Sequence, residues 1–229
     1  MKLAAFFSGG KDSTYAIYDA KKSQHDVKVL FTILPKSDES HLLHFPNISQ
    51  TKIQSKSMQI PQIIQYFDTN EPSMEQSKLD ELIKVAKKTF DFEGIIHGGI
   101  LSEYQKNKFE SLCKNNGLQL ISPIWQKNVL LYMNELLDNN FEFIISSVSS
   151  EGLDESWLGK KIGYSELNEL KSLSKKFQFN LNFEGGEAET FVINCPLFKK
   201  RIKIITSNKI WDGVRGRFEI VDAELENNA

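Results

Sequence analysis

The chain has 229 residues, of which 40% are hydrophobic and 25% charged, and its formal net charge is −2 at pH 7. These values are typical of a globular protein with a substantial core, and the lack of a dominant basic block argues against a nucleic-acid-binding protein. No apolar stretch is long enough to span a membrane, no signal peptide precedes the first motif, and Cys113 and Cys195 do not have the spacing of zinc or iron–sulfur ligands. We therefore expect a reduced, cytoplasmic protein without a membrane partner, and a homo-oligomer stays an open alternative.

The N-terminal segment carries the most informative motif. An apolar run at 3–7 predicts a buried strand, and the motif Ser8-Gly9-Gly10-Lys11-Asp12-Ser13 follows at once and leads into a predicted helix. A strand, a glycine turn and a helix N-terminus offer unpaired backbone N–H groups to a phosphate, and glycines let the backbone approach that anion closely. Because Lys11 follows the glycine pair directly, the spacing is not that of a Walker A loop. An ordinary glycine-rich turn without a ligand is the alternative.

Strands and helices alternate up to about residue 125. The pattern predicts strands at 27–34, 62–67, 94–97 and 118–124, and helices at 48–59, 79–90 (N-cap Ser73) and 102–117 (N-cap Ser102). This alternation is typical of an α/β fold with a doubly wound, mostly parallel sheet, in which ligands lie outside the carboxyl ends of the strands. We therefore expect phosphates at the motif 8–13 and the rest of the ligand near Thr32 and Gly98.

The pattern changes after residue 125, which predicts two domains, 1–125 for the nucleotide and 126–229 for the substrate. The second domain is expected to be smaller and of the α+β type. Its predicted helices span 129–137 and 165–177, its strands span 141–148, 190–194, 201–206 and 217–223, and turns are predicted at Ser207-Asn208 and Asp212-Gly213. The basic run at 199–203 is interpreted as the protection of an edge strand.

The motif at 8–13 resembles the PP-loop of the ATP pyrophosphatases, which cleave ATP between the α and β phosphates. Together with four further segments it resembles the diphthine–ammonia ligase (diphthamide synthase) family of N-type ATP pyrophosphatases. These segments are His-Phe-Pro-Asn at 44–47, Gly-Gly-Ile-Leu-Ser-Glu-Tyr-Gln-Lys at 98–106, Gly-Leu-Asp-Glu-Ser-Trp-Leu-Gly at 152–159 and Glu-Gly-Gly-Glu-Ala-Glu-Thr at 184–190. Two departures concern the shape of the acceptor pocket: Phe183 stands where the family usually has Gly, and Ala188 replaces an aromatic residue.

The resemblance implies an adenine-nucleotide alpha hydrolase-like fold and the ATP-dependent amidation of diphthine, a modified histidine on a translation elongation factor. The diphthine carboxylate would attack the α-phosphorus to give an acyl-adenylate and pyrophosphate, and ammonia from free ammonium would then displace AMP. The adenine of ATP would lie near Thr32 and Gly98. Mg²⁺ would accompany ATP, with Asp12 as its candidate ligand.

The resemblance also assigns roles to residues of this chain. Catalysis is expected from Lys11, Asp12 and Glu187. Nucleotide binding is expected from Ser8, Gly9, Gly10, Lys11, Asp12, Ser13, Thr32 and Gly98, and substrate binding from His44, Tyr104, Gln105, Glu184, Gly185, Gly186, Glu187 and Glu189.

Several alternatives stay open. A tRNA-modifying PP-loop enzyme would adenylate a base before attack by sulfur or an amine, and a thiolase of this kind would need a nucleophilic cysteine. Cys113 lies on an apolar helix face and neither cysteine has evident thiolate-stabilising neighbours, which argues against thiolation. A non-catalytic adenine-nucleotide sensor is a third function. The glutamates at 184–189 could instead form a solvated acidic turn, and His41, His97 and Trp157 could be purely structural.

Overall fold

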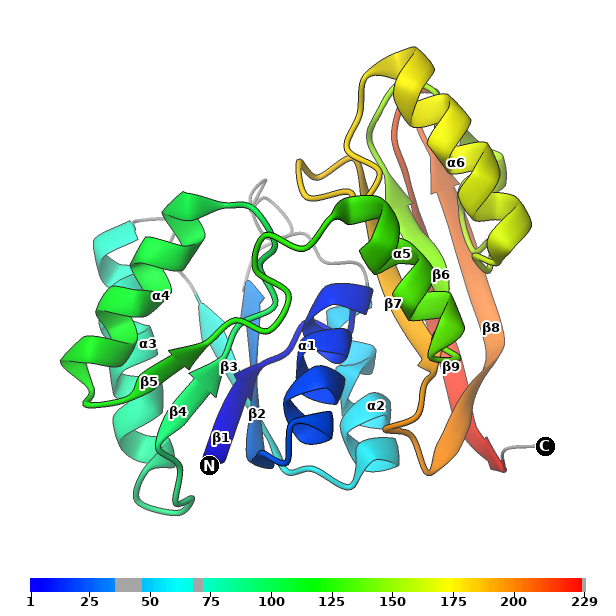
Figure 1. The fold of residues 1–229 in the computed structure, drawn as a ribbon. Helices are drawn as coiled ribbons and strands as arrows, with labels where there is room; N and C mark the ends of the chain where they lie inside the picture. Colours follow the sequence, from blue (N-terminus) through cyan, green and yellow to red (C-terminus); the bar gives the residue numbers. More distant parts are fainter. Residues whose placement is uncertain (36–46, 68–71, 228–229) are drawn as a thin grey trace.

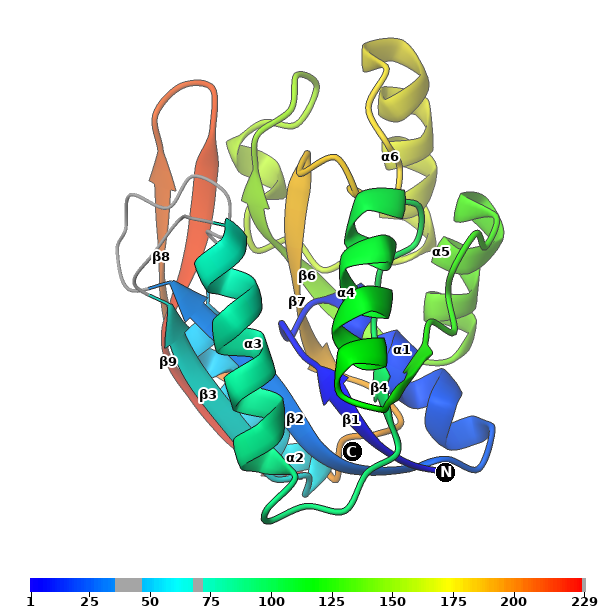
Figure 2. The same ribbon diagram turned by 90° about the vertical axis from the view of Figure 1, so that its left-hand side faces the viewer.

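Two β-sheets organise the molecule (Figures 1 and 2). The structure is a computed structural model, and it describes residues 1–35, 47–67 and 72–227. The first sheet is parallel, with the strand order β3-β2-β1-β4-β5. Its strands are β1 (Lys2–Phe6), β2 (Asp26–Pro35), β3 (Gln62–Phe67), β4 (Gly94–Ile96) and β5 (Gln119–Ile121). The predicted α/β fold with a parallel sheet is confirmed.

Helices cover both faces of the parallel sheet, as Figure 2 shows most clearly. On one face lie α3 (Pro72–Ala86) and α4 (Glu103–Asn115), whose Leu82 and Leu112 belong to the same buried hydrophobic cluster as Val29 of β2. On the other face lie α1 (Lys11–Lys22) and α2 (Thr51–Met58), the latter preceded by the short 3-10 helix η1 (Ile48–Gln50). Apolar residues at helical spacing supply these buried faces, so the packing follows from the periodicity of the sequence.

The second sheet is antiparallel, with the order β7-β6-β9-β8. Its strands are β6 (Glu142–Val148), β7 (Ala188–Asn194), β8 (Lys200–Trp211) and β9 (Gly216–Asn227), and it is accompanied by α5 (Val129–Asp138), the 3-10 helix η2 (Glu155–Trp157) and α6 (Tyr164–Phe177). The smaller α+β part predicted for the C-terminal half is therefore present. Strand β8 is an edge strand, as the basic run at 199–203 predicted.

The helices α1 and α2 lie between the two sheets (Figure 1). Helix α1 contacts β7, and α2 contacts β8 and β9. One hydrophobic core runs through both sheets and includes Ile17 of α1, Met58 of α2 and Phe191 of β7. Because the two sheets share this core, packing alone does not divide the chain into two domains near residue 125. That boundary stays a prediction.

Polar side chains from the start of α2 also join the two halves. Asn47 lies in the left-handed region (φ 69°), and its amide donates to the Phe218 carbonyl at 2.8 Å and accepts from the Ile220 N–H at 2.7 Å. Gln50 donates to the Ile220 carbonyl at 3.1 Å. A side-chain amide thus completes the backbone pairing of β9 from a segment more than 160 residues away.

Two local predictions were wrong. Strand β8 continues through Ser207-Asn208, where a turn was predicted, because register shifts near Thr206 accommodate the polar residues as bulges within the strand. The other predicted turn, at Asp212-Gly213, is confirmed: it joins β8 to β9, and the Asp212 carboxylate accepts from the N–H groups of Val214 and Arg215. Helix α3 begins at Pro72, one residue before the predicted N-cap Ser73, since proline suits the first helical position. No helix in the described part of the chain has the length and apolarity needed to cross a membrane.

Candidate active site

The loop between β1 and α1 is shaped by two glycines and held from the second sheet. Gly9 has φ +79°, and a Cβ there would lie 2.3 Å from Oε1 of Gln54, so both the conformation and the space require glycine. The Gly9 carbonyl accepts from Gln54 Nε2 at 2.9 Å and from the Val192 N–H of β7 at 3.0 Å. Gln54 is fully buried on α2 and also donates to the Val192 carbonyl. Gln54 therefore holds the loop to β7 through two hydrogen bonds. No sequence motif indicated this role.

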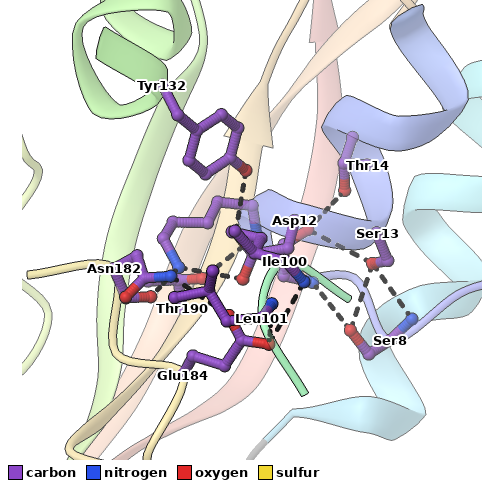
Figure 3. A network of polar contacts seen from close by, with 12 residues as sticks. Ser8, Asp12, Ser13, Thr14, Ile100, Leu101, Tyr132, Asn182, Glu184 and Thr190 are labelled. Carbon is purple, nitrogen blue, oxygen red and sulfur yellow. Dashed lines mark hydrogen bonds and ion pairs between the residues drawn. The ribbon is translucent and has the colours of Figure 1, made fainter. Parts of the chain in front are cut away.

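Two serine hydroxyls close the loop on itself (Figure 3). Ser13 Oγ accepts from the Ser8 N–H at 3.2 Å and lies 3.1 Å from Ser8 Oγ. Gly98, at the end of β4, packs on the first turn of α1, where a Cβ would come within 2.9 Å of the Ser13 backbone. The loop, the N-terminus of α1 and the end of β4 therefore meet at one point, which is the arrangement that binds phosphate in α/β proteins.

Lys11 is almost fully buried and faces the C-terminal half. Its side chain is 2% exposed, and Nζ donates to the Asn182 carbonyl at 2.6 Å and to Asp12 Oδ2 at 2.9 Å. The Phe183 ring lies 5.3 Å below Nζ, and the Lys11 N–H donates to the Thr190 hydroxyl at 3.0 Å. The cation is therefore held by groups from both halves of the chain.

Phe183 has φ +64°, a left-handed conformation that a bulky residue rarely adopts. The family that the sequence resembles usually has glycine at this position, and glycine would adopt the left-handed conformation without strain. In this chain the Phe183 ring stacks on Phe179 and lies under the Lys11 ammonium, so the departure adds an aromatic face to the surroundings of the cation.

Asp12 is one-third exposed, and both its oxygens have donors (Figure 3). Oδ2 accepts from Lys11, and Oδ1 accepts from the hydroxyl of Tyr132 at 2.7 Å. Tyr132 is a fully buried residue of α5. Burial, followed by the charge of Asp12, raises the pKa of Tyr132 well above its usual value, so the hydroxyl stays protonated and donates. Sequence patterns gave no sign of this tyrosine, because it follows the motif by 120 residues.

Glu189 on β7 belongs to the same neighbourhood. Burial raises its pKa to about 7, while the charge of Lys11 opposes that rise and the charge of Asp12 adds to it. Glu189 directly precedes Thr190, whose hydroxyl accepts from the Lys11 N–H, so β7 brings Glu189 close to the Lys11–Asp12 pair. Its assignment to substrate binding stays a prediction. A carboxyl whose pKa lies near neutrality can exchange a proton at physiological pH, which is typical of functional sites.

Glu184 joins the two halves through its carboxylate. Oε1 accepts from the backbone N–H groups of Ile100 (3.1 Å), Leu101 (2.7 Å) and Ser102 (3.0 Å), which precede α4. Oε2 accepts from the side-chain amide of Asn182 at 3.2 Å. Three converging N–H groups at a helix N-terminus form an anion-binding nest, and in this structure the anion is an internal carboxylate. Glu184 thereby fixes the segment that contacts Lys11.

Glu187 shapes the glycine turn between Asn180 and β7. Its Oε1 accepts from the Asn180 backbone N–H (2.9 Å) and from the Asn180 side-chain amide (2.7 Å). Its buried Oε2 has no hydrogen-bond partner among the described residues. Gly185 provides the space for this carboxylate, since a Cβ there would lie 2.7 Å from Oε1, and Gly186 has φ +81°. The turn is therefore ordered around Glu187, and one buried acceptor oxygen of this carboxylate has no partner among the described residues.

Other predicted site residues lie elsewhere. Thr32 is fully buried, and its hydroxyl donates to the Phe7 carbonyl and accepts from Gln62, so a contact between its side chain and adenine is not supported. Tyr104 and Gln105 lie exposed on the first turn of α4, next to the nest that holds Glu184. The predicted residues His41 and His44 lie outside the described residues.

His97 and Trp157 have structural surroundings. The His97 ring packs on Phe109 with centroids 4.3 Å apart, its Nδ1 accepts from the Gly99 N–H, and burial lowers its pKa to about 4. Trp157 is 2% exposed, with Lys160 over its ring. Both side chains therefore stabilise the fold, which was the structural alternative for each.

The residues around the loop 8–13 fit ATP and Mg²⁺. The two glycines, the N-terminus of α1 and the Ser8 and Ser13 hydroxyls fit a polyphosphate. Mg²⁺ is usually held by one or two carboxylates together with substrate phosphates, so Asp12, with its exposed third and remaining lone pairs, fits that requirement. Among the described residues no cluster of three His, Cys, Asp or Glu side chains could hold a metal by itself.

Both cysteines are buried and unbridged. Burial raises the pKa of Cys113 and of Cys195 to about 12, so both stay protonated thiols at neutral pH. Since the thiolate is the nucleophile, these surroundings argue against sulfur transfer by either residue.

The chain matches two family models over most of its length. Residues 1–120 match the diphthamide synthase N-terminal domain, and residues 128–225 match the diphthamide synthase C-terminal domain. Curated relatives named diphthine–ammonia ligase include those of Rattus norvegicus (34% identity) and Homo sapiens (33%), each aligned over 92% of this chain and 85% of the relative. The Schizosaccharomyces pombe relative is 30% identical over 92% of this chain and 37% of its own length. A solved structure from Methanocaldococcus jannaschii, described as a predicted subunit of tRNA methyltransferase, is 17% identical with a TM-score of 0.41. The match covers 86% of this chain and 98% of that chain.

Proposed function

Because the chain belongs to the diphthamide synthase family, we propose that it is a diphthine–ammonia ligase, which uses ATP to join ammonia to the diphthine carboxylate of a translation elongation factor. The relatives that carry this name are ligases. The observation that carries the proposal is the contact between the loop 8–13 and the segment 182–190, made through the backbone and side chain of Lys11. This contact joins the phosphate-binding motif to the acidic turn at 184–190, which is another segment of the family pattern.

The proposed reaction has two steps. A carboxylate oxygen of diphthine attacks the α-phosphorus of ATP, which forms an acyl-adenylate and releases pyrophosphate. Ammonia then attacks the acyl carbon, AMP leaves, and the nitrogen loses a proton to give the amide. Each step develops negative charge on phosphate oxygens, so catalysis depends on positioned donors and cations.

Different residues of the chain would bind the phosphates, stabilise the developing charge and bind the acceptor. The backbone of Gly9 and Gly10, with the hydroxyls of Ser8 and Ser13, would hold the β and γ phosphates. Lys11 would stabilise the departing pyrophosphate, and bound Mg²⁺, held by Asp12 and phosphate oxygens, would neutralise further charge. The turn around Glu187 would lie near the acceptor, and the buried, unpartnered oxygen of Glu187 would accept a hydrogen bond from a small donor such as ammonium.

The test is a reconstituted amidation. The purified protein is incubated with ATP, ammonium and an elongation factor that carries diphthine, and AMP, pyrophosphate and the mass of the modified peptide are measured. We expect AMP and pyrophosphate in equal amounts with the amide product, and loss of all three products in Lys11→Ala. Release of AMP only when unmodified tRNA replaces the elongation factor would instead support a tRNA-modifying enzyme. Tight ATP binding without turnover on any acceptor would support a nucleotide sensor.

A further inference from the structure

The hydrogen bond between Tyr132 and Asp12 holds the Asp12 carboxylate in one orientation. Tyr132 comes from α5, in the C-terminal half, and its hydroxyl reaches Asp12 Oδ1 at 2.7 Å while Lys11 holds Oδ2 (Figure 3). With one donor on each oxygen, the carboxylate plane is fixed although Asp12 is one-third exposed. An exposed aspartate without such support would sample several rotamers and would lose entropy when a ligand fixed it.

The surroundings of Tyr132 make its hydroxyl a fixed donor. The residue is fully buried, and its ring meets the Tyr15 ring edge-on with centroids 5.4 Å apart, so the side chain cannot turn away. Asn128 is the N-cap of α5: its side chain accepts from the Leu131 N–H, and its carbonyl accepts from the Tyr132 N–H. Backbone, ring and hydroxyl are therefore all held.

We propose that Tyr132 is a positioning residue that fixes the carboxylate of Asp12 for the step that consumes ATP. The proposal rests on the proposed function, because it gives Asp12 a role in that step. It adds a contribution from the C-terminal half to the phosphate site, in a residue outside the motifs of the family pattern. Tyr132 acts through Asp12 and does not need to touch the nucleotide.

Tyr132→Phe tests this role, because it removes only the hydroxyl. A hydrogen bond to a charged group is worth enough for about a 10-fold to 100-fold effect on turnover. We expect kcat for AMP formation to fall by that factor while the KM for ATP stays within about twofold, since the phosphate-binding backbone is unchanged. Tyr15→Phe is the matched control: Tyr15 is also buried and its hydroxyl bonds Glu135 at 3.1 Å, without contact to Asp12. It should keep nearly full turnover.

A double-mutant cycle separates positioning from a general structural role. In an Asp12→Ala background, Tyr132→Phe should cost less than about twofold in kcat, because the group through which it acts is gone. The same two substitutions should also be coupled in the free energy of unfolding, measured by urea denaturation, whereas Tyr15→Phe and Asp12→Ala should be additive.

Equal losses from Tyr132→Phe in both backgrounds, or wild-type turnover in the single variant, would overturn the proposal. If the wild-type protein does not amidate diphthine, the proposed function fails in the first measurement. The unfolding cycle then decides the Tyr132 proposal alone: coupling retains Tyr132 as the residue that fixes Asp12, and additivity rejects it.

Discussion

Replacing Glu184 by Ala removes the carboxylate that joins the loop before α4 to the segment beside Lys11. Hydrogen bonds to charged groups contribute about 1.5–3 kcal/mol each, but water can replace the carboxylate at exposed N–H groups. Leu101 is 47% exposed and Ser102 is partly exposed, whereas Ile100 is 2% exposed. We therefore expect the loss of one buried bond rather than three, so the free energy of unfolding should fall by about 1.5–3 kcal/mol.

The assay is urea denaturation followed by the fluorescence of the three tryptophans, with a thermal melt in parallel. For a chain of this size the expected destabilisation corresponds to a decrease in Tm of roughly 3–12 °C. Glu184→Gln keeps an acceptor oxygen and loses the charge, so its effect should be about half as large. Glu169→Ala on the exposed face of α6 is the control and should stay within about 0.5 kcal/mol of wild type. A Glu184→Ala protein as stable as this control would refute the argument that the nest binds Glu184 strongly.

Four further predictions concern the site and the buried groups around it. Glu187→Gln should abolish amidation while ATP affinity, measured by calorimetry, stays near wild type; an equal loss of ATP binding would move the turn to the nucleotide site. Gly9→Ala should weaken ATP binding and stability together, because its φ of +79° and a contact of 2.3 Å with Gln54 both oppose a Cβ, and wild-type binding would contradict this. Cys113→Ser and Cys195→Ala, alone and combined, should keep most amidation activity, with Cys113→Ser less stable by about 1–3 kcal/mol through a buried unpaired hydroxyl; a folded but inactive double variant would favour sulfur transfer. Burial lowers the pKa of His97 from 6.5 to about 4, so the unfolded state binds more protons between these values, and stability should fall as pH decreases through that window. His97→Gln should make that fall shallower in denaturation curves at several pH values, and an unchanged slope would contradict the assignment.

The parallel sheet and the loop at 8–13 could be predicted from sequence because their signals are local. Apolar runs, glycines and a serine N-cap lie next to the elements they specify, and Ser102 does accept from the Gln105 N–H as predicted. The error at Ser207-Asn208 has the same origin, since turn-forming residues inside a strand look the same whether the chain reverses or bulges.

The residues that hold the site in place, Tyr132 and Gln54, could not be predicted, because each bonds a segment far away in the chain. Tyr132 meets Asp12 across 120 residues, and Gln54 meets Val192 across 138. A single tyrosine on an apolar helix face has the pattern of a core residue, and only the fold shows that its hydroxyl reaches a carboxylate. Thr32 is the converse case: it lies in the expected strand, but its hydroxyl donates to the Phe7 carbonyl within the sheet and does not face a ligand.

The shared core between the two sheets has a mechanical consequence. Proteins that close two lobes around a ligand do so by rotating about an interface that is small and polar. In this chain a comparable rotation would have to separate Ile17, Met58 and Phe191 and break the Asn47 contacts with β9. We therefore expect the two sheets to move as one body during turnover, so that ATP and the bulky acceptor protein must approach along the rim of loops at the carboxyl ends of the strands.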